Sequence, residues 1–312
     1  MNRPIRTRFN FCRRAVTIAC VWAMGLFWGS FLPHLSADDS GKTLLRYKFT
    51  PGQVVRYDVT LNDDYQIQVG TETDEPYSHQ QSVKNYQVMS VNPDGSAILQ
   101  LTIESVQLEI YQNGDKFNYD SLVDTGPQEQ AVFQAMKNLV GKPHLQITMS
   151  TRGEVSAFLP LVKGNQVPDN PQQVAFDVLL RLPEEPLAEG ESWKENFQVI
   201  LPIPDSKLTR TVKMQRQHTL KKLEGALATI DVETKVLSIL ESTDDEMQLL
   251  RRQPDGTVII DLERGLLVSK TLHQDKQVTG FGTGASFMNF KQRLSEKLRL
   301  DQTASEQPVP SK

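Results

Sequence analysis

The segment PDGTVIIDLERGLLVSKTL, residues 254–272, contains the residues of this chain that most resemble a catalytic group. Two acidic residues, Asp261 and Glu263, and a positively charged one, Arg264, lie between two short apolar runs. Paired carboxylates that face each other across a cleft perform general acid–base chemistry in glycoside hydrolysis. The segment therefore poses a choice between a catalytic loop and the bend of a hairpin.

The same segment also has the features of a β-hairpin turn. Asp261 alternates with apolar neighbours, as a solvent-facing strand residue does, and Gly265 can supply the bend. QITMSTRGEVSAFL, residues 146–159, has the same pattern, with Gly153 at the corresponding place. Because the chain uses this pattern twice, we interpret it as a turn and predict no catalytic residue in it.

The histidines after the N-terminal segment do not form a recognisable metal site. They are His79, His144, His218 and His273. No pair has the i, i+4 spacing that places two ligands on one helix face. His218 and His273 fall in predicted strands, and His79 falls in a predicted polar loop over 70–81. We predict no metal ligand and no cofactor.

Other catalytic and binding motifs are also incomplete. GFGTGAS (280–286) lacks the lysine and hydroxyl that a phosphate-binding loop needs at fixed offsets. The chain has no G-x-S-x-G nucleophile elbow. The acidic stretches DDS (38–40) and STDDE (242–246) lack the alternating ligand spacing of a calcium loop.

The N-terminus predicts export. MNRPIRTRFNFCRR has five arginines and no acid, and an apolar run up to Pro33 follows it. A basic region, an apolar region and a small residue at the cut, here Ala37, are typical of a secretory signal over 1–37. The apolar run is also long enough for an uncleaved membrane anchor. In both cases we expect a periplasmic or extracellular protein, in contact with the membrane only through this segment.

The cysteines lie in that same segment. Cys12 and Cys20 are the two cysteines of the chain, so the exported part has none. Structural disulfides, thiolate zinc sites and a cysteine nucleophile are therefore excluded there. Lipid attachment at Cys20 is not favoured, because Thr17 stands where a lipoprotein signal has a leucine-like residue. The net charge of −4 is mild, and nucleic acid is not an expected partner.

Beyond Asp38 the sequence predicts strands in two similar sets. The first strand is expected over 44–49 (LLRYKF), apolar residues alternate, and Pro-Gly, Asp-Gly and Asn-Gly turns separate the runs. KFTPGQVVRYDVTL is echoed by PLAEGESWKENFQVIL, which pairs Gly52 with Gly190. We predict a first β repeat over 38–183, a second over 184–300, and a disordered tail over 301–312.

The predicted fold class is mainly β, with some helix. So many antiparallel strands favour one large sheet that curls, since twisted open sheets of more than about ten strands do not stay flat. Two helices, over 127–141 and 171–182, are expected to cover the concave face, and a short helix is expected over 291–300. Two packed sheets or two small tandem barrels are the alternatives.

The apolar faces of the two covering helices give the candidate ligand site. Its predicted residues are Phe133, Met136, Leu139, Val140, Phe176, Leu179 and Leu180. One interpretation is an ordinary core between helix and sheet. The other is a slot between helices and sheet that holds a lipid chain.

The opening LLRYKFTPGQVVRYDVTL resembles an uncharacterised family of exported bacterial β-rich proteins, whose members begin with L-R-[YW]-x-[FL]-x-x-G. LPEEPLAEGESWKENF is similar to the proline-rich entry of that family to G-[DE]-x-W. The resemblance extends over much of residues 43–273. It implies no known activity and no functional residues. At the level of fold, such sheets are similar to the half-barrels of lipoprotein-localisation factors and related lipid carriers.

Three hypotheses for function follow. The first is an exported, non-enzymatic protein that binds a lipid or lipoprotein-like apolar ligand between sheet and helices. The second is an envelope scaffold or protein-interaction module that contacts another envelope protein through strand edges or through the loop over 71–82. The third, a hydrolase of exported polymers, depends on the acidic turns alone.

Overall fold

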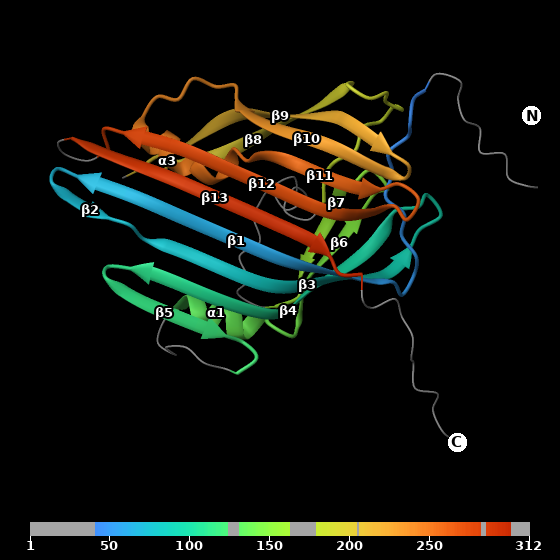
Figure 1. Ribbon diagram of the computed structural model, residues 1–312, viewed down its shortest axis with the longest axis horizontal. Helices are drawn as coiled ribbons and strands as arrows, with labels where there is room; N and C mark the ends of the chain where they lie inside the picture. Colours follow the sequence, from blue (N-terminus) through green and yellow to red (C-terminus); the bar gives the residue numbers. More distant parts are fainter. Residues whose placement is uncertain (1–40, 124–130, 163–178, 205, 282–284, 301–312) are drawn as a thin grey trace, which may run out of the picture. The chain divides into compact units, whose positions relative to one another are not determined.

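The computed structural model of the protein, shown in Figure 1, describes residues 41–123, 131–162, 179–204, 206–281 and 285–300. The predicted signal segment over 1–37 and the predicted tail over 301–312 lie outside these residues. The predictions of export and of a disordered tail therefore stay predictions.

The strands of the described residues form a 13-stranded sheet in which neighbouring strands are antiparallel. They are β1 (Val54–Val69), β2 (Glu72–Asp74), β3 (Tyr77–Val91), β4 (Ala97–Gln112), β5 (Asp115–Asp120), β6 (Pro143–Met149), β7 (Val155–Pro160), β8 (Ser192–Pro202), β9 (Thr209–Glu224), β10 (Leu227–Val236), β11 (Asp255–Asp261), β12 (Leu266–Thr279) and β13 (Ser286–Leu298). Their order is β7-β6-β4-β3-β1-β13-β12-β11-β10-β9-β8, with β2 on β1 and β5 on β4. The predicted mainly β class and large curled antiparallel sheet are confirmed (Figure 1).

The two strand sets occupy opposite halves of this sheet. β1 to β7 follow one another outward from the centre on one side, and β8 to β12 follow one another inward on the other. The turn before each set makes the same hydrogen bond: Gly52 N donates to Val88 O at 2.8 Å, and Gly190 N donates to Leu220 O at 2.7 Å. These facts agree with the echo between the two sequences, while the duplication and its boundaries stay predictions.

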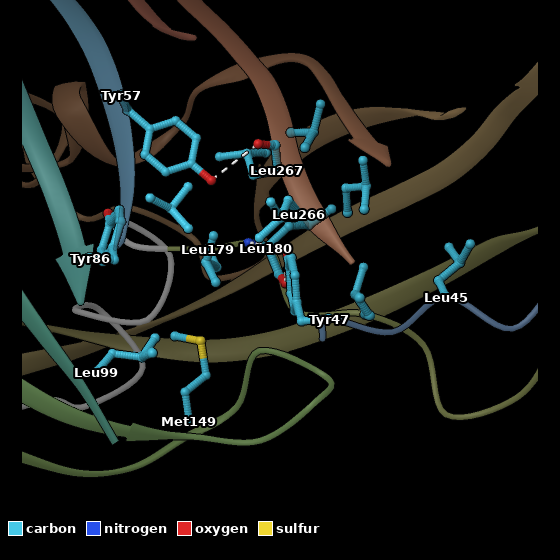
Figure 2. Packing of buried hydrophobic residues seen from close by; sticks show 14 of the residues in the cluster. Leu45, Tyr47, Tyr57, Tyr86, Leu99, Met149, Leu179, Leu180, Leu266 and Leu267 are labelled. Atoms are coloured by element: carbon cyan, nitrogen blue, oxygen red, sulfur yellow. Dashed lines mark hydrogen bonds between the residues drawn. The ribbon is translucent and has the colours of Figure 1, made fainter. Parts of the chain in front are cut away.

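The main core lies on the inner face of the sheet, where the segments that precede β1 and β8 pack (Figure 2). Thr43 and Leu187 pair these two segments in an antiparallel bridge. The buried Tyr47 hydroxyl donates to Leu180 O at 2.9 Å and accepts from Leu180 N at 3.1 Å. Tyr57, on β1, donates to Leu267 O at 3.1 Å. The hydroxyls of Tyr47 and Tyr57 thus each have a backbone partner, as burial of a polar group requires.

Two short helical segments lie against the same sheet. Helix α1 (Ala131–Leu139) buries Phe133 against Tyr119 of β5 and its neighbours on β4. Helix α3 (Thr243–Leu249) continues into the 3₁₀ turn η1 (Leu250–Arg252). Ser242 caps α3, because its side chain accepts from Asp245 N, and the acids of STDDE therefore stabilise a helix start. No helix among the described residues has the length and apolar character that crossing a bilayer demands.

The prediction of a helix over 291–300 is wrong, because these residues belong mostly to β13. Leu294 and Leu298 are four residues apart, a spacing that fits one helix face but equally fits one face of a strand. In the structure Phe290, Leu294 and Glu296 alternate with outward-facing residues, and β1 and β12 pair on both sides. Pairing on two sides outweighs the local helix preference.

Three further expectations differ from the structure. Of the helix predicted over 171–182, residues 171–178 lie outside the described residues, and Leu179 to Leu182 are not helical. The strand expected over 44–49 is irregular backbone that bonds to two hairpin turns, through Tyr47 N to Thr151 O and Lys48 N to Gly265 O. The loop expected over 70–81 contains β2 and the start of β3, so that His79 lies in a strand.

The glycine of the β6–β7 turn provides a test of how tightly the core packs. Gly153 has φ +80°, and a Cβ there would lie 2.5 Å from Leu180 O. Gly114 has φ +85° with open space around it. We expect Gly114→Ala to cost about 1 kcal/mol for its left-handed backbone, and Gly153→Ala to cost a further 1–3 kcal/mol or so for overpacking. Urea unfolding measures both; equal losses would show that the turn does not contact the core.

Candidate functional site

An open groove of about 660 Å³ lies where β1, β3, β4 and β13 meet η1. Most of its lining is aromatic or apolar, and comprises Tyr65, Ile67, Pro76, Tyr77, Ile110, Tyr111 and Met288. The polar part of the lining is Ser78, Gln112 and Arg251. A concave apolar site with a few polar groups is the usual form of a small-molecule site.

The register between β1 and β13 positions the floor of the groove. Tyr65 lies opposite Phe290, and Ile67 lies opposite Met288, so that all four side chains share the inner face. The rings of Tyr65 and Phe290 are 4.8 Å apart between centroids. On the other side of β1, the pairing of β3 with β4 places Ile110 opposite Ser78 on this face. Strands from both halves of the chain therefore build one floor.

The groove adjoins the apolar cluster beneath α1. Ile110 lines the groove and also packs against the cluster that contains Phe133, Met136 and Val140. Phe133 is buried, whereas Met136 and Val140 are half-buried. Apolar surface therefore continues from the sheet to the helix at this place.

Arg251 of η1 forms the opposite side of the groove. Its guanidinium Nη2 lies 2.8 Å from Asp63 Oδ2 and 2.6 Å from the Tyr65 hydroxyl. Its Cζ lies about 6 Å from the ring centroids of Tyr65 and Phe290, within reach of a cation–π contact. Burial raises the pKa of Tyr65, although Arg251 acts against this, and the phenol is therefore neutral at physiological pH.

Beneath Arg251, a row of polar side chains crosses the inner face. Gln292 Nε2 donates to Asp63 Oδ1 at 2.8 Å, and Gln274 Nε2 donates to Gln292 Oε1 at 2.8 Å. Asp63 is 4% exposed, and its two oxygens accept from Gln292 and Arg251. A buried carboxylate with these partners serves the structure of the groove rather than proton transfer.

A second buried polar cluster lies on β8 and β9. Glu195 Oε2 is 3.3 Å from Arg216 Nη1 and 3.8 Å from His218 Nε2. His218 is 0% exposed and stacks on Trp193, with ring centroids 4.9 Å apart. Burial lowers the pKa of His218, and the charge of Arg216 lowers it further, while Glu195 acts in the opposite direction. His218 is therefore neutral in the folded protein at pH 7.

The seven residues predicted to bind a ligand fall into separate places. Phe133, Met136 and Val140 belong to the cluster beneath α1, and Leu139 of the same helix is half-buried. Leu179 and Leu180 belong instead to the main core, beside Tyr47 and Tyr57 in Figure 2. Phe176 lies outside the described residues. A ligand-binding role for these residues stays a prediction.

Asp261 is the last residue of β11, and Glu263 lies in the turn that joins β11 to β12. Arg264 N donates to Asp261 Oδ1 at 2.8 Å, and the Glu263 carbonyl oxygen accepts from Lys48 Nζ at 2.9 Å. The predicted turn between β11 and β12 is thus confirmed. His79 Nε2 lies 2.8 Å from Asp64 Oδ1. Across the described residues, no three histidine, cysteine or acidic side chains are grouped to hold a metal.

Sequence patterns did not identify the residues of the groove. The alternation of Tyr65 and Ile67 within DDYQIQV indicates a strand with an apolar face. The same alternation cannot show that Met288 lies opposite Ile67, because β1 and β13 are far apart in the sequence. Only the register between distant strands brings the groove together.

Comparisons with known proteins give little further guidance. The sequence matches no protein-family model, and no curated protein matches it. A solved structure of lipid–protein interactions in lipovitellin is similar over 84% of this chain, with 12% identity and a TM-score of 0.32. An acetoacetate decarboxylase-like enzyme from Sphingomonas wittichii RW1 is similar over 80% of this chain and 94% of its own, with 8% identity and a TM-score of 0.11.

This chain spans 27% of the length of the lipovitellin chain that it matches. Both TM-scores are too low for either likeness to support an argument about function. The resemblance to exported bacterial β-rich proteins likewise stays a prediction.

The buried histidine predicts how stability depends on pH. Because the pKa of His218 is lower in the folded than in the unfolded state, its contribution is complete above about pH 6.5 and is lost as pH falls below that value. We expect the free energy of unfolding to fall more between pH 7.5 and 5.5 in the native protein than in His218→Phe. The difference is at most about 1.4 kcal/mol per pH unit.

His273→Gln is the matched control, because His273 is exposed on β12. Urea unfolding at the two pH values measures all three proteins. Identical pH dependence in the native protein and His218→Phe would contradict the assignment of a neutral, buried histidine.

Proposed function

We propose that this protein is an exported, non-enzymatic binding protein that holds a lipid chain or a similar apolar ligand in the groove between sheet and helices. The observation on which this depends is the apolar groove itself, with Ile110 in contact with the α1 cluster and Arg251 of η1 at the other side. The basic and apolar pattern of residues 1–37 supports the export part of the proposal.

The size and lining of the groove fit such a ligand. Its volume of about 660 Å³ is within the usual range for small-molecule sites. Each methylene group that a ligand buries there contributes about 0.8 kcal/mol. Tyr65 adds flat apolar surface together with a hydroxyl group, a combination that suits a ligand with one polar end.

A role as an envelope scaffold is the second candidate, and one observation favours it. β8 is the last strand in the sheet order, and Ile200 on it is 66% exposed. An edge strand with an exposed apolar side chain can pair with a strand of another protein. The hydrolase hypothesis loses one of its acidic pairs, since Asp261 ends β11 and Glu263 lies in the hairpin turn that follows.

An uncharged fluorescent probe tests the binding proposal. Diphenylhexatriene becomes fluorescent in apolar surroundings, and we expect the purified protein to enhance its emission saturably. Ile67→Glu places a carboxylate in the half-buried floor of the groove and should weaken binding about tenfold or more, because burial of a charge is costly. Ile200→Glu makes the same chemical change on β8, away from the groove.

The outcomes show whether the probe binds in the groove or elsewhere on the protein. Lost probe binding in Ile67→Glu with intact binding in Ile200→Glu supports the groove. No saturable binding by the native protein, or equal binding by all three proteins, would contradict it. Circular dichroism of each variant shows whether the sheet is retained.

A further inference from the structure

Hydrogen-bond donors gather at one end of the groove, where η1 crosses β1 and β13. Arg251 uses Nε and Nη2 to donate to the Tyr65 hydroxyl, at 3.1 and 2.6 Å, and Nη2 also pairs with Asp63. The hydrogen bonds formed among the described residues use neither Nη1 of Arg251 nor the proton of the Tyr65 hydroxyl. The Arg251 side chain is 57% exposed, so these donors are accessible from the groove.

Positive charge exceeds negative charge at this end. Arg251 is charged, and the groove lining of the described residues contains no carboxylate. Asp63, beneath it, balances one charge. Lys276 of β12 lies on the inner face directly opposite Phe290, the residue whose ring Arg251 overlies. Within the described part of the chain, Lys276 forms no ion pair. Arg251 and Lys276 together carry two positive charges, and Asp63 balances one of them. One positive charge is therefore left for a ligand to balance.

We infer that the ligand is a long-chain carboxylate, whose head group binds Arg251 and Tyr65 while its chain lies along Ile67 and Met288. This inference rests on the proposed function and specifies the class of ligand. The two carboxylate oxygens match the free Nη1 and hydroxyl donors, and charge-assisted bonds to a guanidinium are strong. A single negative charge balances the excess at this end, whereas a doubly charged phosphate monoester does not.

The surroundings make this end more selective than an exposed arginine would be. The rings of Tyr65 and Phe290 hold the guanidinium on one side, and Asp63 fixes its orientation. An oriented guanidinium loses less conformational freedom on binding than a free one. The apolar floor begins next to it, so that head group and chain have separate, adjacent places.

Three ligands of equal chain length test the inference by isothermal titration calorimetry at pH 8. Decanoate, decanol and decyltrimethylammonium differ in head-group charge, and the purified native protein is the binding partner. We expect decanoate to bind about tenfold more tightly than decanol, and the ammonium to bind most weakly. Equal affinity for decanoate and decanol, or a preference for the ammonium, would overturn the inference.

Variants assign the preference to individual residues. Arg251→Gln should abolish the tenfold preference for decanoate over decanol, a ratio from which any loss of groove contact common to both ligands cancels. Lys276→Gln, which leaves the Asp63 pair intact, should reduce it about threefold through the loss of a nearby charge. Arg293→Gln removes an exposed charge from the outer face of β13 and should change nothing.

Whether decanol binds distinguishes a failure of this inference from a failure of the proposed function on which it rests. If decanol binds and the preference for decanoate is the same in the native protein, Arg251→Gln and Lys276→Gln, the head-group assignment fails while the apolar groove stands. If the native protein binds none of the three ligands, the proposed function fails as well. Circular dichroism of each variant shows whether it is folded.

Discussion

The pairing of β1 with β13 is the contact on which the rest of the structure depends. It runs from Tyr57 opposite Leu298 to Val69 opposite Ser286, and it joins the two halves of the chain into one sheet. A buried ionic cluster spans the strands on both sides of this junction. Glu296 of β13 lies 2.9 Å from Lys84 of β3 and 3.0 Å from Lys270 of β12. Although burial alone raises the pKa of Glu296, the two lysines lower it below its usual value, so that the carboxylate stays charged.

A sheet built in this way has an inner face that must be covered. At one end the segments before β1 and β8 fill it, with Tyr47 bonded to Leu180. Elsewhere α1 covers part of β4 and β5, and η1 packs against β12 and β13 through Leu250. The groove lies between these covers, where aromatic and apolar side chains stay accessible. The proposed ligand site is thus a consequence of how the sheet is covered, and it needs no separate domain.

Local patterns predicted the parts of this fold that depend on neighbours in the sequence. Alternation and turn glycines such as Gly153 and Gly265 predicted the hairpins, which are confirmed. The Leu294 and Leu298 spacing fits both a helix and a strand, and only pairing with β1 and β12 decides between them. The start of α3 was missed because Ser242 and the acids after it resemble an ordinary polar turn.

The groove could not be predicted, because its floor joins residues such as Ile67 and Met288 from opposite ends of the described chain. The helix α1 was predicted from its apolar spacing, and its burial of Phe133 follows from that pattern. What the pattern could not show is that Leu179 and Leu180 pack in a different cluster. Contacts between distant strands, unlike amphipathic faces, leave no periodic signal in one sequence.

Native mass spectrometry of the protein isolated from the cells that produce it tests the central claim most directly. The claim is that the groove between sheet and helices holds an apolar ligand in its natural setting. We predict a noncovalent adduct with the mass of a lipid or long-chain acid, which is released when the protein unfolds. A protein that is always found at its own mass alone, under conditions that preserve known lipid complexes, would contradict the account.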